Sequence, residues 1–348
     1  MTGQNILTKK ISSPFIFTLV LVVFFTIFGI IVIPKIQDKA LEVQKIYLTG
    51  PMINLSELEQ EVYLGFVGDI MVDRGVESII KNYGNGDFKF PFYKIADYSK
   101  RLDIMFGNLE GPISDVGEDV GSIYSFRQNP KLIEGLRFAG FDILSFANNH
   151  VFDWGRVAFE DTMKRLKEAG IEYVGAGFSR EEALSPKIIK IKGLKIAFLA
   201  FSNIGEKFWE AGENSSGIAW LDKENLEYAI SKAKPEADIL IISMHFGDEY
   251  KDQPNADQKY FAKLAIDLGA NLVIGHHPHV VQLIEKYKDS YIAYSLGNFI
   301  FDQNFSKETM QGLFLEVAIK DGQIKDIIPR KIKINNFFQP EIVNEQFE

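Results

Sequence analysis

The feature that most restricts the fold is a regular alternation of short apolar runs with amphipathic segments. Apolar runs typical of β-strands occur at 62–67, 103–106, 141–146, 171–174, 238–244 and 271–274. Segments of helical periodicity lie between several of these runs, at 130–139, 156–169 and 255–268. Strands that are apolar on both faces and are separated by such helices are typical of a sheet covered on both sides. The alternation predicts a layered α/β domain.

Two other segments have the pattern of antiparallel hairpins. Residues 187–202 alternate around Lys192-Gly193, and residues 312–334 alternate around Asp321-Gly322. Asp-Gly between two apolar runs is a strong two-residue turn motif. We therefore expect more than one sheet within a single large domain, because no repeat or low-complexity tract interrupts the pattern.

Residues able to bind metals follow the carboxyl ends of five predicted strands. In open α/β sheets, ligands bind in the crevice beyond these strand ends. We therefore expect the five loops to converge on one site, which would contain all five histidines of the chain. The candidate residues are Asp69, Glu110, Asn148, Asn149, His150, His245, His276, His277 and His279.

Most of these residues have a structural explanation when each is taken alone. Asp69 is suited to capping a turn or helix, and Asn148 and Asn149 tolerate left-handed turn geometry. Asp153 is expected to N-cap the helix that follows it, and His245 alone fits a hydrogen-bonded structural histidine. Their coincidence at strand ends favours a metal site.

The ligand chemistry narrows the choice of metal. The chain has no cysteine, so thiolate ligands and cysteine nucleophiles are excluded. A set of Asp, Glu, Asn and His suits Mn, Fe or Zn, bound as one or two ions. The buried charge of Glu110 would be costly without a partner. His277 and His279 have the spacing that places both side chains on one face of an extended chain.

Other candidates concern substrate binding. They are Arg74, Arg127 and His276. Guanidinium groups pair with carboxylate or phosphate, although a surface salt bridge is the alternative for either arginine. A Ser-His-Asp site has no support, because no G-x-S-x-G motif is present.

The amino-terminal region predicts a membrane anchor. Phe15–Ile33 contains no charged residue and would span roughly 28 Å as a helix, close to the thickness of a bilayer core. No small-residue cleavage site follows, so an uncleaved anchor is favoured over a signal peptide. We expect a cytoplasmic tail at 1–14, an anchor at 15–33, a stalk at 34–60 and an extracytoplasmic domain at 61–348.

The charge of the chain argues against one class of partner. The formal net charge is −9, and all 47 acidic residues follow residue 34. Nucleic-acid binding without sequence preference needs a basic surface. Nucleic acid is therefore not an expected partner.

Six motifs in order resemble the CapA-type capsule and poly-γ-glutamate synthesis proteins. The resemblance runs from about residue 62 to about residue 330 and implies a membrane-tethered protein with its large domain outside the cell. The motifs are GDIMVDRG (68–75), GNLEGPIS (107–114), FANNHVFDWG (146–155), MHFGDEY (244–250), GANLVIGHHPHVVQ (269–282) and YSLGNFIFDQ (294–303).

This family is similar in fold to the calcineurin-like metallophosphoesterases, which are four-layer α-β-β-α sandwiches with a two-metal centre. By this resemblance the metal ligands would be Asp69, Glu110, Asn149, His245, His277 and His279, and the catalytic residues would be His150 and Asn148. Met71 stands where those enzymes have a histidine ligand, so this chain departs from their pattern at one metal position.

Two functions remain after this reading. The first is biosynthesis of an anionic envelope polymer, with membrane subunits of a synthesis complex as partners. The alternative is a metal-dependent phosphoesterase or other hydrolase acting on a cell-envelope substrate.

Overall fold

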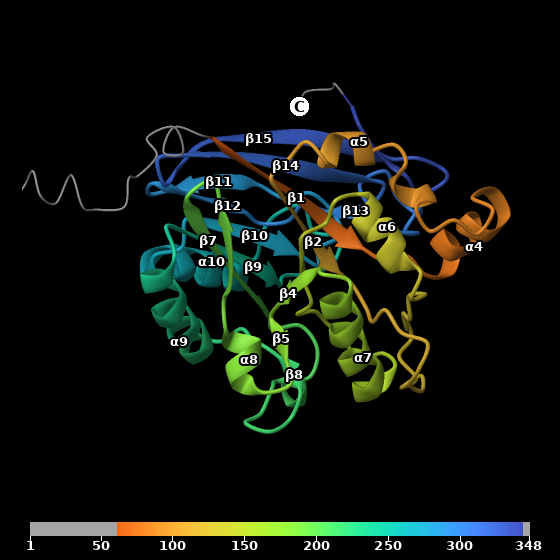
Figure 1. Ribbon diagram of the computed structural model, residues 1–348, viewed down its shortest axis with the longest axis horizontal. Coiled ribbons are helices and arrows are strands. Elements are labelled where there is room, and N and C mark those ends of the chain that lie inside the picture. The colour runs from red at the N-terminus through yellow and green to blue at the C-terminus, as the bar shows by residue number, and fades with distance from the viewer. Residues whose placement is uncertain (1–60, 344–348) are drawn as a thin grey trace, which may run out of the picture. The chain divides into compact units, whose positions relative to one another are not determined.

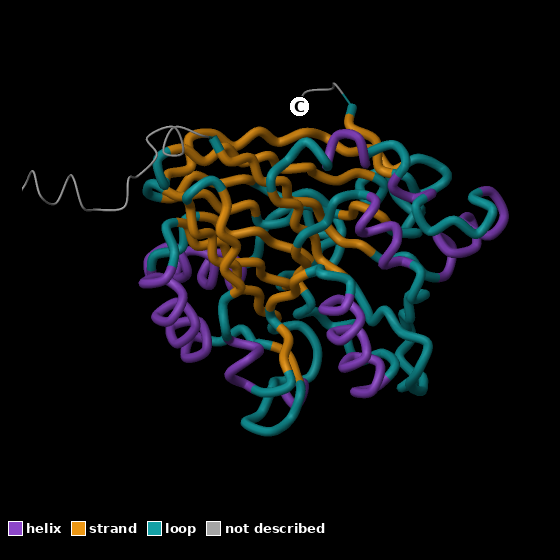
Figure 2. Tube along the Cα trace, in the orientation of Figure 1, coloured by secondary structure: helices purple, strands orange, loops and turns teal. Residues whose placement is uncertain are grey.

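The computed structural model describes residues 61–343, which belong to one compact unit beginning at Ser56. Within this part, two large β-sheets form the centre, with helices outside them (Figures 1 and 2). The predicted tail, anchor and stalk (1–60) lie outside the described residues. No helix within 61–343 is long and apolar enough to cross a membrane.

The first sheet has eight strands in mixed orientation. Parallel pairs join β1 to β2, β2 to β3 and β3 to β4, and β13 (Asn298–Ile300) pairs in parallel with the end of β1. The other strands follow in the order β16 (Pro340–Ile342), β15 (Gln323–Ile334), β14 (Gln311–Lys320), β1 (Val62–Ile70), β2 (Ile104–Leu109), β3 (Ile143–Ser145) and β4 (Glu172–Val174).

The second sheet has six strands, and its centre is also parallel. A separate two-stranded sheet pairs β5 (Ala176–Gly177) with β8 (Gly217–Ile218). The six strands are ordered β11 (Ile284–Tyr287), β12 (Ser290–Ala293), β10 (Leu272–His276), β9 (Ile239–His245), β7 (Leu194–Ser202) and β6 (Lys187–Ile191).

Helices connect many of the strands. The helix α10 begins at a capping box formed by Asn255 and Gln258, and it ends at Gly269, whose φ of 118° suits glycine. The α-helices are α4 (Arg74–Tyr83), α5 (Ala96–Ser99), α6 (Leu132–Phe138), α7 (Gly155–Glu168), α8 (Arg180–Leu184), α9 (Lys223–Ala233) and α10 (Ala256–Leu268). Short 3₁₀ helices are η2 (Phe90–Phe92), η3 (Lys207–Trp209) and η4 (Lys234–Glu236).

The central strands of the second sheet are buried on both faces, as their apolar sequences predict. Along β7, Phe198 and Ala200 join the core shared with the first sheet, whereas Leu199 and Phe201 join the core shared with α9 and α10. Phe106 of β2 stacks on Phe198 of β7 with ring centroids 5.8 Å apart, and this contact ties the two sheets together. The expected mixed α/β fold with more than one sheet is confirmed.

The individual elements also agree with the sequence. The six predicted strand runs correspond to β1, β2, β3, β4, β9 and β10, and the three predicted helices correspond to α6, α7 and α10. Both predicted hairpins form, as β6–β7 and as β14–β15. Local periodicity was sufficient here because these strands are apolar on both faces.

The strand register brings the carboxyl ends together. Asp69 of β1 lies opposite Asn108 of β2, and His245 of β9 lies opposite His276 of β10. The glycine before His276 is required by space, because a Cβ on Gly275 would lie 1.9 Å from the carbonyl oxygen of Tyr294. Parallel pairing therefore places polar residues from both sheets at one edge.

Candidate metal centre

Asp69 occupies the middle of this edge and is fully buried. Its Oδ1 accepts a hydrogen bond from Asn108 Nδ2 at 2.8 Å, and its Oδ2 accepts one from the His277 backbone N–H at 3.3 Å. The Nδ1 atoms of His276 and His279 lie 3.4 and 3.3 Å from its two oxygens. Burial alone would raise the pKa of Asp69, but these imidazoles outweigh it and hold the pKa well below its usual range.

Glu110 follows β2 and is also fully buried. Neither of its carboxylate oxygens has a hydrogen-bond partner among residues 61–343. The nearest ring nitrogens are Nε2 of His279 at 3.6 Å and Nε2 of His150 at 3.8 Å. Burial, together with the charge of Asp69, raises the pKa of Glu110 well above its usual value.

Gln128 fixes the backbone that carries Glu110. Its Nε2 donates to the carbonyl oxygens of Glu110 at 3.3 Å and Gly111 at 3.0 Å, and its Oε1 accepts from Val72 N at 2.8 Å. Gln128 is fully buried, so all three bonds lie in a dry environment. Nothing in the sequence singles out Gln128, since it lies in a segment without periodicity.

His277 and His279 do not lie on an extended segment, so that part of the prediction is wrong. The strand β10 ends at His276, and the next residues turn with φ values of 96° at His277 and 57° at His279. The rings still approach each other, with centroids 6.0 Å apart. A left-handed turn, which the i, i+2 spacing does not predict, brings both rings to the edge.

The two imidazoles differ in their electrostatic surroundings. Burial and the nearby His279 lower the pKa of His277 to about 3. Burial also opposes a charge on His279, but the carboxylates of Glu110 and Asp69 outweigh it and raise its pKa to about 9. His277 is therefore a neutral imidazole with a free Nδ1, whereas His279 shares the field of two carboxylates.

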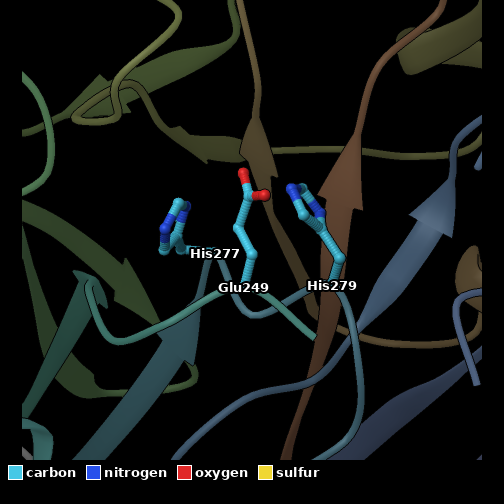
Figure 3. Close-up of side chains that lie close together, drawn as sticks. All are labelled: Glu249, His277 and His279. Atoms are coloured by element: carbon cyan, nitrogen blue, oxygen red, sulfur yellow. The ribbon is translucent and has the colours of Figure 1, made fainter. Parts of the chain in front are cut away.

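Within the described part of the chain, two groups of residues place ligand atoms close enough to hold a cation. In each group the nitrogen and oxygen atoms all lie within 4.8 Å of one another. Figure 3 shows the group formed by Glu249, His277 and His279, in which the carboxylate of Glu249 lies between the two rings. The groups are Asp69, Glu110 and His279, and Glu249, His277 and His279. They share His279.

Glu249 was missed by the sequence reasoning. It lies four residues after His245, in a motif quoted for the resemblance, and its side chain is exposed. An acidic residue that follows a strand-end histidine within one loop was the available indication.

His245 and Asn149 lie on the side of the second sheet. The Nε2 of His245 is 2.7 Å from Asn149 Oδ1, and its Nδ1 is 3.3 Å from Asn108 Nδ2. Its ring centroid is 4.9 Å from that of His277. Burial, with His277 nearby, lowers the pKa of His245 well below its usual value. All the residues expected to bind metal are thus brought together.

Asn148 has a different position. Its Nδ2 donates to the carbonyl oxygen of Leu109 at 2.8 Å, and its Oδ1 accepts from the His150 backbone N–H at 3.1 Å. These bonds join the loop after β3 to the end of β2. The structure places Asn148 as a support for this loop, fully buried behind the edge.

His150 is held by Asp153, and the expected helix cap is wrong. The helix α7 begins at Gly155, and its N-cap is Trp154 without a side-chain hydrogen bond. The Oδ2 of Asp153 instead lies 2.8 Å from His150 Nδ1 and accepts from Phe126 N at 2.9 Å. Burial raises the pKa of Asp153 above its usual value. The pair leaves His150 Nε2 directed towards Glu110.

A pocket of about 390 Å³ opens at the metal cluster. Arg74 reaches it and pairs with Asp302, so the expected salt bridge of Arg74 is confirmed. Arg127 forms no ion pair among the described residues, and its guanidinium lies 3.5 Å from the centroid of the Trp154 ring. The pocket is lined by Arg74, Tyr124, Phe126, His150, Glu249, Tyr250, His279, Asp302, Gln303 and Phe305.

His276 does not line this pocket. Its ring is fully buried beside Asp69, and neither ring nitrogen has a hydrogen-bond partner within residues 61–343. The structure therefore brings Arg74 to the pocket, and it places Arg127 and His276 elsewhere.

Asn298 is a further residue that the sequence reasoning did not assign. Its Oδ1 lies 3.0 Å from His279 Nδ1, and its Nδ2 donates to the carbonyl oxygen of Thr309 at 2.9 Å and to Gln303 Oε1 at 3.1 Å. These bonds fix the orientation of the His279 ring and leave its Nε2 towards Glu110.

A solved structure described as a novel phosphatase from Mycoplasma pneumoniae matches 79% of this chain and 94% of its own, at 13% identity and a TM-score of 0.49.

Sequence comparison identifies the family. The family described as bacterial capsule synthesis protein PGA_cap matches residues 63–303. Capsule biosynthesis protein CapA of Bacillus anthracis is 32% identical, covering 79% of this chain and 68% of that protein. PGA biosynthesis protein CapA of Bacillus subtilis (strain 168) is also 32% identical, covering 80% of this chain and 76% of that protein. The chain therefore belongs to the PGA_cap family of bacterial capsule synthesis proteins.

Proposed function

We propose that this protein acts in the biosynthesis of an anionic envelope polymer of the poly-γ-glutamate type, and that a divalent metal site serves this role. The observation that carries the metal site is Glu110, whose two buried oxygens have no hydrogen-bond partner within residues 61–343. A buried carboxylate without partners costs several kcal/mol, on the order of 3. A cation offsets this cost directly. The names of the two CapA relatives support the polymer.

The residues present fit a divalent transition metal. Asp69, Glu110 and His279 supply two carboxylates and an imidazole, and His277 adds a neutral imidazole with an unpaired nitrogen. Glu249 completes the second group, while Asn149 and His245 lie beside it. Such oxygen and nitrogen ligands suit Mn, Fe or Zn. When bound, the metal supplies Lewis acidity and neutralises an anionic group of the substrate.

The topology belongs to the same proposal. Residues 15–33 form a single membrane anchor, and the domain from residue 61 onwards lies outside the cytoplasm, where it meets the polymer and membrane subunits of its synthesis complex. The apolar run without charge supports this arrangement. Protease added to wall-free cells should digest the domain; complete protection of the domain would contradict the topology.

A second candidate function is phosphoester hydrolysis, in a four-layer fold of the metallophosphoesterase type. The pairing of His150 with Asp153 favours it. Asp153 holds Nδ1 of His150, and His150 lines the pocket, so its Nε2 can give a proton to a leaving oxygen. Arg74 lines the same pocket and can orient a phosphate.

The polymer role is tested in the native host by replacing the chromosomal copy with His277→Ala or Glu110→Gln. Cell-surface γ-glutamate polymer should fall by about tenfold or more, because each variant removes a metal ligand. Glu308→Gln, an exposed carboxylate outside both ligand groups, is the matched control and should keep the wild-type level. Wild-type polymer in both ligand variants would refute the role of the site.

The hydrolytic alternative has its own measurement. The purified full chain with Mn should hydrolyse bis-p-nitrophenyl phosphate, and His150→Asn should lower the rate by about hundredfold while leaving the bound metal unchanged. If the metal-loaded wild type shows no hydrolysis above the metal-free protein, this candidate is excluded and the first is unaffected.

A further inference from the structure

A second polar pocket lies at the opposite end of the sheets from the metal cluster. It has a volume of about 520 Å³ and is bounded by the turns of the β11–β12 and β14–β15 hairpins. Asn271, at its base, directly precedes β10, whose far end carries His276. The two residues are five positions apart along an extended strand, so the pocket is roughly 16 Å from the metal edge. It is lined by Asn271, Lys286, Asp289, Tyr291, Gln323 and Lys325, among others.

The two lysines of this pocket have no carboxylate partner. Within residues 61–343, Lys286 and Lys325 form no ion pair, in contrast to the neighbouring Lys288, which pairs with Asp267. The Nζ of Lys286 lies 5.6 Å from the centroid of the Tyr291 ring. The Nζ of Lys325 donates to Gln323 Oε1 at 3.4 Å, a long bond to a neutral oxygen. Two ammonium groups on separate hairpins therefore face one space without a counter-charge of their own.

Two amide side chains add further donors. The Oδ1 of Asn271 accepts from the Leu240 backbone N–H at 2.8 Å, and the Oε1 of Gln323 accepts from Lys325. Their oxygens are thus occupied, and their NH₂ groups have no acceptor among the described residues. Four donor groups around one space match the needs of a carboxylate, which accepts several hydrogen bonds.

Among residues 61–343, Asp289 is the one carboxylate that lines the pocket. Together with Lys286 and Lys325, it gives the pocket a net charge of +1. The Asp289 carboxylate itself repels an anionic ligand. Without metal, the pocket at the metal cluster is less favourable for an anion, because Glu249 and Asp302 line it and Arg74 pairs with Asp302. An anionic chain therefore finds its better electrostatic complement at the lysine pocket.

We propose that this lysine pocket binds the carboxylates of an anionic polymer chain, so that the domain holds the chain at a place separate from its metal site. The identity of the polymer rests on the proposed function. The inference that the ligand is anionic rests on the pocket alone. Glu61, the first described residue, lies 3.8 Å from Lys320 at the end of the β14 strand. The first described residue of the polypeptide therefore lies at the same end of the domain as the lysine pocket.

The test measures binding of a fluorescein-labelled decamer of γ-linked glutamate to the full chain in detergent, with EDTA to remove metal. The double variant Lys286→Gln/Lys325→Gln should bind about tenfold more weakly, because two partly exposed charge contacts are lost. Asp289→Asn should bind about threefold more tightly, because it removes the opposing charge. Lys288→Gln is the matched control: it changes the charge equally, lies beside the pocket and should bind within about twofold of wild type.

Three results would overturn the proposal. One is equal binding by the double variant and by Lys288→Gln, which would assign the effect to overall charge. Another is equal affinity for a glutamine decamer, which lacks the carboxylates. The third is complete displacement by inorganic phosphate at the concentration of the decamer, which would indicate a small-anion site rather than a chain site.

The outcome is separate from that of the proposed function. His277→Ala should bind the decamer as tightly as wild type does, since the metal is absent in this assay. If the pocket fails while the ligand variants still lose polymer in cells, the metal role stands and the lysine pocket does not. Loss of decamer binding in His277→Ala would contradict the separation of the two sites.

Discussion

The two ends of the sheets are opposite in how they treat charge. At the carboxyl ends, Asp69, Glu110 and His279 are buried with at most 2% of their surface exposed. At the opposite end, Lys286 and Lys325 are exposed to solvent and lie on the strands β11 and β15, close to the hairpin turns. A charge that is removed from water must be compensated by fixed partners, whereas an exposed charge needs none. The charges of the metal site therefore depend on the residues packed around them, whereas the charges of the lysine pocket depend mainly on the lysine side chains themselves.

This difference predicts where substitutions act. At the metal end, a change should affect ligand binding and folding together, because the same hydrogen bonds hold the fold and orient the ligands. At the lysine pocket, a change should affect binding alone. The following expectations separate the two ends, in order of decreasing effect.

The largest effect is expected from His279→Ala. Both candidate ligand groups contain His279, so its loss should remove metal from both, with apparent affinity for Mn falling by about hundredfold or more. Glu249→Gln removes a ligand from one group and should leave the other group able to bind. Bound metal is measured by elemental analysis after equilibrium dialysis of the full chain.

Two outcomes would break the comparison for this site. Wild-type metal content in His279→Ala would show that the shared residue is not a ligand. Loss of all metal in Glu249→Gln would show that the two groups are not separate. Lys325→Gln, at the other end, is the control and should keep the wild-type metal content.

The sequence predicted the strands and the meeting of their ends because both follow from short-range patterns. Runs such as the one that forms β9, buried at every position, indicate a sheet covered on both faces. Parallel order then requires the loops after these strands to share an edge. That is why the sequence could place all five histidines at one edge of the sheets without tertiary information.

What the sequence could not predict depends on long-range contacts and on local handedness. The positive φ of His277 and His279 follows from bonds to other strands, such as His277 N–H to Asp69. Asp153 has the spacing of a helix cap, but its carboxylate is taken by His150 and Phe126 N. A capping preference of about 1 kcal/mol is easily outweighed by such bonds in a buried site.

The next effect concerns stability and compares two glutamines. Gln128→Ala should lower the free energy of unfolding by about 2–3 kcal/mol, because it leaves buried backbone groups of Val72, Glu110 and Gly111 without partners. Gln323→Ala, the same substitution at the exposed lysine pocket, should change it by less than about 0.5 kcal/mol. Urea unfolding of the metal-free protein measures both. Equal losses would show that the metal end has no special dependence on its supports.

The smallest effect, and the most specific, is a gain in stability from Glu110→Gln in the metal-free protein. Burial raises the pKa of Glu110 in the folded state above its value in the unfolded chain. The proton is therefore bound more tightly when the protein is folded, and stability from this group is complete below the unfolded pKa, about 4.5, and is lost as the pH rises. Glutamine resembles the protonated form and should avoid that loss.

At neutral pH the variant should be more stable by about 1–2 kcal/mol, and the difference should vanish below about pH 4.5. Saturating Mn should reverse the order, because only the wild type gains the free energy of metal binding. Glu249→Gln is the matched control: its carboxylate is exposed, so it should gain no stability without metal. If metal-free Glu110→Gln were less stable than wild type at every pH, the Glu110 carboxylate would be satisfied without a cation. The metal end would then resemble the lysine pocket, whose charges need no fixed partner.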